Sequence, residues 1–167
     1  MDIKNYTNLF HGSNKYIVDY LKPFTSFHYA PYVYTTSDYY YALVRCGKFD
    51  MEKFLIKEDY TNDLFTLVEL EENAFDKVFD TDGYIYITYG NFIHTDDCME
   101  NEYISETVCP IIETLYISNV KEAILNNSHH YRIIKHDDTE YWKTVRGGKE
   151  GYLQRRRERI EKIKETR

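Results

Sequence analysis

The sequence has no long apolar run and few cysteines, and these absences exclude several classes of protein. No stretch of about 18 apolar residues occurs, so we expect no membrane-spanning helix. The polar start, residues 1–6, lacks the apolar segment of a signal peptide, which indicates the cytoplasm. Cys46, Cys98 and Cys109 are scattered without a CxxC pair, which argues against a disulfide framework or a cysteine-rich zinc site. Burial as free thiols is the commoner fate of such cysteines, while catalytic thiol chemistry stays open.

Glycine-rich phosphate-binding loops are also missing. The seven glycines form neither the GxGxxG pattern of dinucleotide-binding domains nor a P-loop, so a bound nucleotide would have to be held in another way. No internal repeat or low-complexity linker divides the 167 residues, a length that matches one domain. Hydrophobic residues make up 43% of the chain, enough for a buried core.

Aromatic residues are abundant instead: the chain has 18 Tyr, 9 Phe and 1 Trp. Tyrosine combines an apolar ring with a polar hydroxyl, which suits half-exposed strands and pockets that stack planar ligands. A biased codon usage that places tyrosine at ordinary core positions explains the same composition equally well.

Charge is distributed unevenly. Eight Lys/Arg against four Asp/Glu give residues 149–167 a net charge of +4, so residues 1–148 carry −11 of the total of −7. An acidic body argues against sequence-independent nucleic-acid binding over the whole surface. We therefore expect one domain over residues 1–148 and a charged helix over residues 149–167. The helix has a thin apolar stripe of Tyr152, Leu153, Ile160 and Ile163, which predicts a solvated terminal helix or an arm for an acidic partner.

Local patterns predict short strands and few helices. Residues 32–36 are rich in aromatic and β-branched side chains, which favours a strand. Ser37-Asp38 is a typical helix N-cap and Gly47 a typical stop, so a helix is expected over residues 39–46. The other expected strands are residues 6–10, 64–70, 84–88, 102–105 and 111–117, and a second helix is expected over residues 120–125. This mixture indicates an α+β fold and not a doubly wound parallel sheet.

Three short motifs carry chemical information. They are Leu9-Phe10-His11-Gly12-Ser13, Tyr32-Val33-Tyr34-Thr35-Thr36 and Asn101-Glu102-Tyr103-Ile104-Ser105. A His-Gly pair at a strand end exposes an imidazole beside a backbone that a planar ligand can approach closely, although histidines at turns also serve as caps. In the third motif the alternation of a strand puts Glu102 and Ile104 on one face, so Glu102 is either an edge charge or a carboxylate in a cleft.

In this order the three motifs resemble the ADP-ribosyltransferase superfamily, in particular the His-Tyr-Glu branch of the poly(ADP-ribose) polymerases and diphtheria toxin. The resemblance covers roughly residues 7–120. It extends to small bacterial and phage proteins in which a segment similar to residues 102–105 leads into a proline, here Pro110. It implies an α+β fold in which two small antiparallel sheets form an NAD cleft, with peripheral helices.

The resemblance also implies a function. Proteins of this kind use NAD as a substrate, cleave the nicotinamide–ribose bond and transfer ADP-ribose to an acceptor, which here is an unknown protein or nucleic acid. Without a recognisable regulatory helical domain, single ADP-ribose units are expected rather than chains. The alternative is a catalytically inactive nucleotide- or protein-binding module of the same fold.

Roles for individual residues follow from the same resemblance. Glu102 would stabilise the oxocarbenium-like state of the ribose, the same electronic problem as in glycoside cleavage. His11 would bond a ribose hydroxyl, and the Gly12 backbone would hold the nicotinamide carboxamide with help from Ser13. Tyr34 would stack on the nicotinamide ring.

Neighbouring residues leave two of these roles open. Glu100 and Glu106 compete with Glu102, although only Glu102 lies in the Asn-Glu-Tyr-Ile context. The rings that compete with Tyr34 are Tyr32, Tyr39, Tyr40 and Tyr41, and Tyr41 is included among the expected cofactor-binding residues.

Histidines and aspartates also cluster between residues 129 and 138, where zinc or another divalent ion is conceivable. Adjacent histidines in a strand point to opposite faces, and no cysteine is near. A polar loop is the better interpretation, and we assign no metal site.

Overall fold

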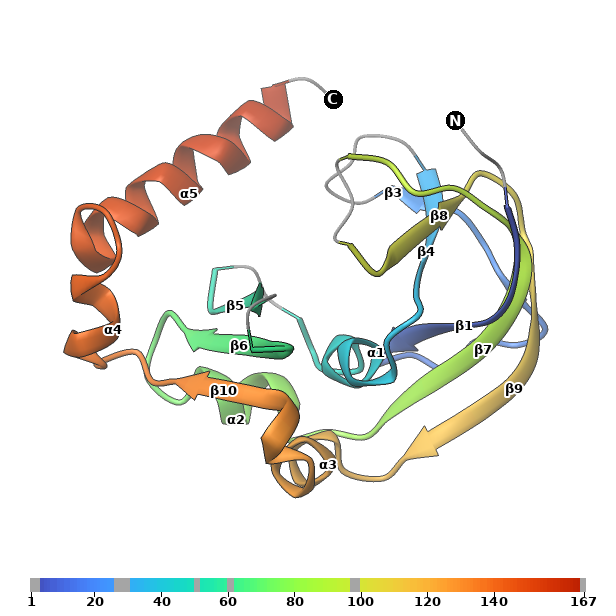
Figure 1. The fold of residues 1–167 in the computed structure, drawn as a ribbon, viewed down its shortest axis with the longest axis horizontal. Helices are drawn as coiled ribbons and strands as arrows, with labels where there is room; N and C mark the ends of the chain where they lie inside the picture. Colours follow the sequence, from blue (N-terminus) through green and yellow to red (C-terminus); the bar gives the residue numbers. More distant parts are fainter. Residues whose placement is uncertain (1–3, 26–30, 50–51, 60–61, 97–99, 166–167) are drawn as a thin grey trace.

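The computed structural model describes residues 4–25, 31–49, 52–59, 62–96 and 100–165. Figure 1 shows the arrangement of the elements. The strands are β1 (Lys4–Ser13), β2 (Tyr20–Leu21), β3 (Phe24–Thr25), β4 (Pro31–Thr36), β5 (Phe54–Asp59), β6 (Leu64–Glu69), β7 (Gly83–Phe92), β8 (Glu102–Ser105), β9 (Cys109–Ile117) and β10 (Tyr131–Ile134). The helices are α1 (Tyr39–Arg45), α2 (Ala74–Phe79), α3 (Val120–Asn126), the 3-10 turn η1 (Ser128–His130), α4 (Thr139–Lys143) and α5 (Gly148–Glu165).

Two sheets make up the body of the protein. The larger sheet has the order β2-β9-β7-β1-β4-β3, and β8 pairs with β4. All its pairings are antiparallel, and it curls strongly (Figure 1). The α+β class expected from the sequence is therefore confirmed.

The smaller sheet differs from the expectation of two antiparallel sheets. Its order is β10-β6-β5, with an antiparallel pair β5–β6 and a parallel pair β6–β10. Parallel neighbours need a long crossover connection. Here that connection runs through α2, β7, β8, β9 and α3, so β10 returns beside β6 in the same direction.

Helix α1 lies between the two sheets and not at the periphery, where the helices were expected (Figure 1). The Asp38 carboxylate accepts hydrogen bonds from the backbone N–H groups of Tyr40 at 2.8 Å and Tyr41 at 3.2 Å, which caps the helix as predicted. Four consecutive residues, 41–44, are buried. A helix buried on consecutive positions is covered on several sides, which explains why α1 carries the largest hydrophobic cluster.

Aromatic residues occupy both the core and the surface. Phe54 packs edge-on against Phe79 with ring centroids 5.0 Å apart, and both rings are fully buried. Tyr86 is fully buried as well, whereas Tyr16 and Tyr116 are exposed. Tyrosine thus serves as a core residue at some positions and as a solvent-exposed surface residue at others.

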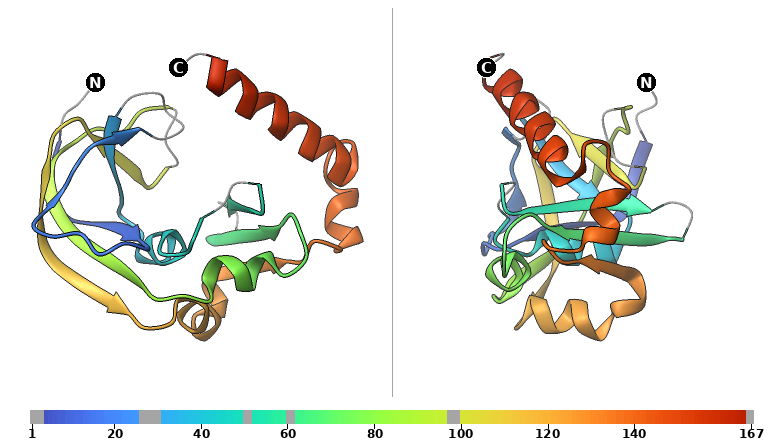
Figure 2. Two further views of the ribbon diagram at one scale, coloured as in Figure 1. Left: turned by 180° about the vertical axis from the view of Figure 1, so that it is seen from behind. Right: turned by 90° about the vertical axis from the view of Figure 1, so that its left-hand side faces the viewer.

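The charged C-terminal segment forms helix α5, Gly148–Glu165. Tyr152 of α5 contacts the Trp142 ring at a centroid distance of 5.8 Å, and Leu153 packs on the same small cluster. From there α5 runs across the open side of the molecule and faces the curled sheet (Figures 1 and 2). Within the described residues, no helix is both long and apolar enough to cross a membrane.

Gly12 lets β1 and α1 approach each other closely. A Cβ atom added to Gly12 would lie 1.9 Å from the backbone oxygen of Ala42 and 3.0 Å from the Cβ of Arg45. Such a contact with backbone cannot be relieved by a side-chain rotation. The close packing of β1 on α1 therefore requires glycine at position 12, whether or not a ligand binds there.

We predict that Gly12→Ala destabilises the fold by about 3 kcal/mol, the upper end of the usual cost of overpacking. For a chain of this size the melting temperature should fall by about 6–12 °C. Ser13→Ala is the matched control, because the Ser13 hydroxyl only accepts a bond from the exposed Lys15 N–H at 3.1 Å. Thermal unfolding followed by circular dichroism measures both. If Gly12→Ala melted like Ser13→Ala, the close contact with α1 would be wrong.

Candidate active site

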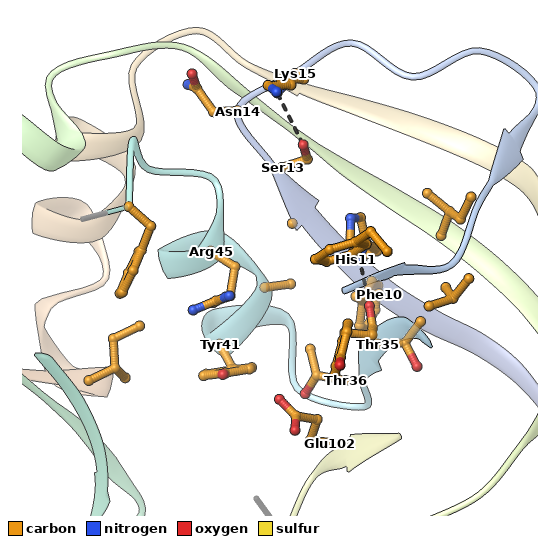
Figure 3. A pocket seen from close by; sticks show the side chains of 18 of the residues that line it. Phe10, His11, Ser13, Asn14, Lys15, Thr35, Thr36, Tyr41, Arg45 and Glu102 are labelled. Atoms are coloured by element: carbon orange, nitrogen blue, oxygen red, sulfur yellow. Dashed lines mark hydrogen bonds between the residues drawn. The ribbon is translucent and has the colours of Figure 1, made fainter. Parts of the chain in front are cut away.

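One pocket of about 770 Å³ lies between the curled sheet, α1, β5 and α5. Its volume falls within the range of about 300–1,000 Å³ that is typical of small-molecule and cofactor sites. Figure 3 shows side chains from several elements directed toward this space. Its lining includes every site residue expected from the sequence: His11, Gly12, Ser13, Tyr34, Tyr41 and Glu102.

Strand pairing explains why three distant motifs meet. Phe10 of β1 pairs with Thr36 of β4, and Thr36 pairs with Glu102 of β8 on the other edge. Paired Cα atoms in antiparallel strands lie about 4.5–5.5 Å apart, so Phe10 and Glu102 are about 10 Å apart across three strands. His11 follows Phe10 directly. The histidine and the glutamate therefore lie within the reach of one nucleotide.

Glu102 is a carboxylate in the pocket wall. It is 9% exposed, and in Figure 3 its side chain extends from the start of β8 toward Thr36 and Tyr41. The competing Glu100 and Glu106 are exposed and lie outside the pocket lining. The structure thus favours the cleft interpretation of Glu102 over that of an edge charge.

The backbone around Glu102 is held from two sides. The Ser37 N–H donates to the Asn101 carbonyl at 3.0 Å. His94 Nδ1 lies 2.8 Å from the Glu102 carbonyl oxygen, and because a carbonyl can only accept, the imidazole donates this bond. His94 is a positioning residue that no sequence signal indicated.

Another buried carboxylate, Glu69, has a structural task. It is 1% exposed, and its Oε2 accepts a hydrogen bond from the Phe75 backbone N–H at 2.8 Å, near the start of α2. Its Oε1 lies 3.7 Å from Lys135 Nζ. The buried position of Glu69 is therefore explained by the fold.

His11 contacts the backbone of β4. Its Nδ1 lies 2.6 Å from the Tyr34 carbonyl oxygen, so Nδ1 carries the proton and donates it. Burial lowers the pKa of His11 below its ordinary value of 6.5, the nearby Arg45 charge acts in the same direction, and the bond to the Tyr34 carbonyl opposes both. The imidazole is thus neutral at pH 7, which makes Nε2 a hydrogen-bond acceptor.

Along residues 11–13, β1 has a described strand neighbour on one side only, while α1 packs closely on Gly12 and the Ser13 backbone bonds the Cys46 thiol. Residues 11–13 pair with Tyr86, Ile85 and Tyr84 of β7, whereas the described pairing of β1 with β4 consists of Phe10 and Thr36 alone. Where a strand has a neighbour on one side only, alternate residues present backbone N–H and C=O groups on the other side. A ligand with its own donor and acceptor fits such an edge.

Two of the five candidate tyrosines line the pocket. Tyr34 is half-buried and stands beside Phe24, with ring centroids 5.2 Å apart. Tyr41 is 7% exposed and packs against Phe65 at 5.6 Å. Tyr39 and Tyr40 instead line a separate, smaller pocket. The choice of a stacking ring is therefore reduced to Tyr34 and Tyr41.

The pocket is basic although the protein is acidic. Among the described residues that line it, Glu102 is the one carboxylate, and five side chains are cationic: Lys15, Lys22, Arg45, Arg156 and Arg159. The chain as a whole has a net charge of −7. Arginine and lysine gathered on a concave surface favour an anionic ligand. Sequence analysis missed these residues, because only the tertiary fold brings α5 to β1 and α1.

Cysteine chemistry finds no support in the described residues. Cys46 and Cys109 are free and buried. Burial raises the pKa of the Cys46 thiol to about 12, so the thiolate that would act as a nucleophile does not form near neutral pH. Cys98 lies outside the described residues.

The cluster between residues 129 and 138 consists of separate contacts. His130 stacks on Tyr40 with ring centroids 3.4 Å apart, and the Asp138 carboxylate caps α4 by accepting from the Tyr141 N–H at 3.0 Å. Among the residues that the structure describes, no three His, Cys, Asp or Glu side chains gather in a way that could hold a metal ion.

Comparisons of the chain with protein-family models, curated proteins and solved structures find no match. The functional assignment therefore depends on the residues of the pocket and on the motifs that supply them. Its chemistry consists of a neutral histidine, a buried carboxylate, two tyrosine rings and a basic rim.

We predict that His11 titrates below pH 6.5 and is protonated on Nδ1 at pH 7. The unfolded chain then binds this proton more readily than the folded chain, so stability declines as the pH falls from 6.5 toward the folded pKa and is unaffected by His11 above that range. Imidazole ¹⁵N and ¹H NMR shifts, assigned with His11→Gln, measure the midpoint and the tautomer. A midpoint at or above 6.5, or a proton on Nε2, would contradict the described environment.

Proposed function

We propose that this protein is an NAD-dependent mono-ADP-ribosyltransferase. It would cleave the nicotinamide–ribose bond of NAD and transfer ADP-ribose to a protein or nucleic-acid acceptor. The observation that supports this most directly is the meeting of His11, Tyr34 and Glu102, from three separate motifs, in one pocket. The strand register that brings Phe10, Thr36 and Glu102 side by side is independent of the resemblance.

Glu102 is the proposed catalytic carboxylate. As the bond to nicotinamide breaks, positive charge develops on the ribose, and a nearby carboxylate stabilises that charge. Its low exposure matters because charges interact more strongly where water is excluded. Nicotinamide leaves as a neutral base, and the acceptor atom that bonds to the ribose carbon gives up its proton.

His11 and the adjacent backbone are the proposed binding groups. Nε2 of a neutral imidazole accepts a hydrogen bond, which suits the O–H of a ribose hydroxyl and does not suit a ligand group that can only accept. The backbone N–H and C=O groups of residues 11–13 suit the carboxamide of nicotinamide, whose NH₂ group donates hydrogen bonds and whose C=O group accepts them. Because the Ser13 hydroxyl already accepts from the Lys15 N–H, we expect Ser13 to contribute as a donor.

Tyr34 is the preferred stacking ring, and Tyr41 is the second candidate. Tyr34 belongs to an aromatic wall with Phe24 and Tyr32, whose ring centroid lies 6.0 Å from that of Tyr34. Such a wall presents a large rigid surface to a planar ligand. Tyr41 is more deeply buried and holds its place against Phe65.

A nucleotide-binding module without catalysis is the second candidate. The basic lining of the pocket favours an anionic ligand whether or not a bond is cleaved. The buried free cysteines fit a reducing compartment, so we propose the cytoplasm as the location for either function.

We predict that the purified chain releases nicotinamide from NAD and that Glu102→Gln lowers the rate by about 10²–10³-fold, the scale of losing one electrostatic stabiliser. Because the carboxylate acts mainly in the transition state, NAD affinity should change no more than a fewfold. Chromatography of released nicotinamide gives the rate, and calorimetry gives the affinity.

Glu100→Gln and Glu106→Gln are the matched controls, since they remove the same charge at exposed positions beside the same strand. Both should keep nearly the full rate. An active parent whose Glu102→Gln variant keeps that rate would exclude Glu102 as the catalytic group. A parent that binds NAD but releases no nicotinamide with protein, RNA or water as acceptor would support the binding module instead.

A further inference from the structure

The C-terminal helix α5 contributes a wall of the pocket. Arg156, Arg159 and Ile160 line it, and their spacing of three and four residues places them on one face of the helix. Tyr152, one turn before Arg156, lies on the same face and packs against Trp142. The inward face of α5 is therefore anchored at one end by aromatic packing and carries two arginines further along.

The orientation of these arginines distinguishes them from their neighbours. Arg156 is half-buried, whereas Arg155, Arg157 and Arg159 are exposed. Arg159 lines the pocket with Arg156, whereas Arg155 and Arg157, which flank Arg156 directly, lie outside its lining. The Arg156 guanidinium donates to the Tyr152 hydroxyl at 3.1 Å, which orients it along the inward face.

Cations stand on the opposite side of the same space. Arg45 projects from α1, with its guanidinium carbon 4.7 Å from the centroid of the Phe49 ring. Lys15 follows β1 and Lys22 follows β2. Like charges that face one another across a pocket repel unless an anion lies between them. A group with two negative charges would balance this arrangement better than a single carboxylate.

We infer that α5 is the diphosphate-binding arm of the site, with Arg156 and Arg159 as the residues that bind the phosphates of a nucleoside diphosphate. Arginine suits this task because its planar guanidinium bonds phosphate oxygens in pairs. The placement of that diphosphate within NAD rests on the proposed function. The acidic partner expected for the charged helix is then a small ligand inside the pocket and not a macromolecule.

The test compares two double variants of the full chain with equal charge. Arg156→Gln/Arg159→Gln should bind ADP at least about tenfold more weakly than the parent, because charge-assisted hydrogen bonds are each worth about that factor. Arg155→Gln/Arg157→Gln removes the same charge from the outward side and should stay within about twofold. Calorimetry at fixed ionic strength measures ADP, pyrophosphate and adenosine binding, and melting temperatures verify that both variants fold.

Binding of uncharged adenosine separates loss of phosphate contacts from a general structural defect, because only a structural defect would weaken it. Its affinity should be equal in the parent and in both variants, while pyrophosphate should follow ADP. Equal losses of ADP affinity in the two double variants would reveal unspecific electrostatics and overturn the inference. A parent that binds neither ADP nor pyrophosphate, or an inward variant that binds them unchanged, would also overturn it.

Failure of this inference can be told apart from failure of the proposed function. If the inward variant loses ADP but the parent never cleaves NAD, α5 keeps its phosphate-binding role and the transferase assignment fails. If the parent cleaves NAD and the inward variant keeps its ADP affinity, the transferase assignment stands and α5 is not the diphosphate-binding arm.

Discussion

The close approach of β1 to α1 at Gly12 is the constraint on which the site depends. The Ala42 carbonyl occupies the space where any other residue at position 12 would carry its Cβ. This contact fixes α1 against the strand that bears His11, and the Asp38 cap fixes where α1 begins. Tyr41 and Arg45, one turn apart on α1, consequently face the pocket together with His11 and Glu102. A small shift of this helix would alter every one of these relations.

Much of the fold around the site is encoded locally and could be predicted. The strand at residues 102–105 and the helices beginning at Tyr39 and Val120 have strong signals, namely β-branched or aromatic residues and capping side chains. Other elements lack such signals. Helix α2 begins after Asn73, whose φ of 60° comes without a side-chain cap bond, and β5 ends in the charged run Lys57-Glu58-Asp59. These elements depend on tertiary packing, of β5 on β6 and of α2 on β5 and α3, which a local pattern does not reveal.

The candidate site divides in the same way. His11, Tyr34 and Glu102 belong to short motifs whose order along the chain is visible, and the strand register then brings them together. A role for Arg156 in the site could not be predicted, because in the sequence it is one of three consecutive arginines in a charged helix. Which of them lines the pocket depends on how α5 packs on the rest of the protein, and that packing includes the contact of Tyr152 with Trp142. Gly12 has a structural role at the close contact with α1, and a ligand-binding role for its backbone is compatible with it.

The wall contributed by α5 also makes the pocket a late product of synthesis and folding. Its other walls come from residues 10–56 and from Glu102, whereas Arg156, Arg159 and Ile160 follow more than fifty positions later. Chains are made at about 5–20 residues per second, so the N-terminal walls exist for several seconds before the last wall emerges. The parallel pairing of β10 with β6 adds a further non-local step before α5 can dock. A nascent chain would thus hold most of the binding groups while still lacking the cations that complete the pocket.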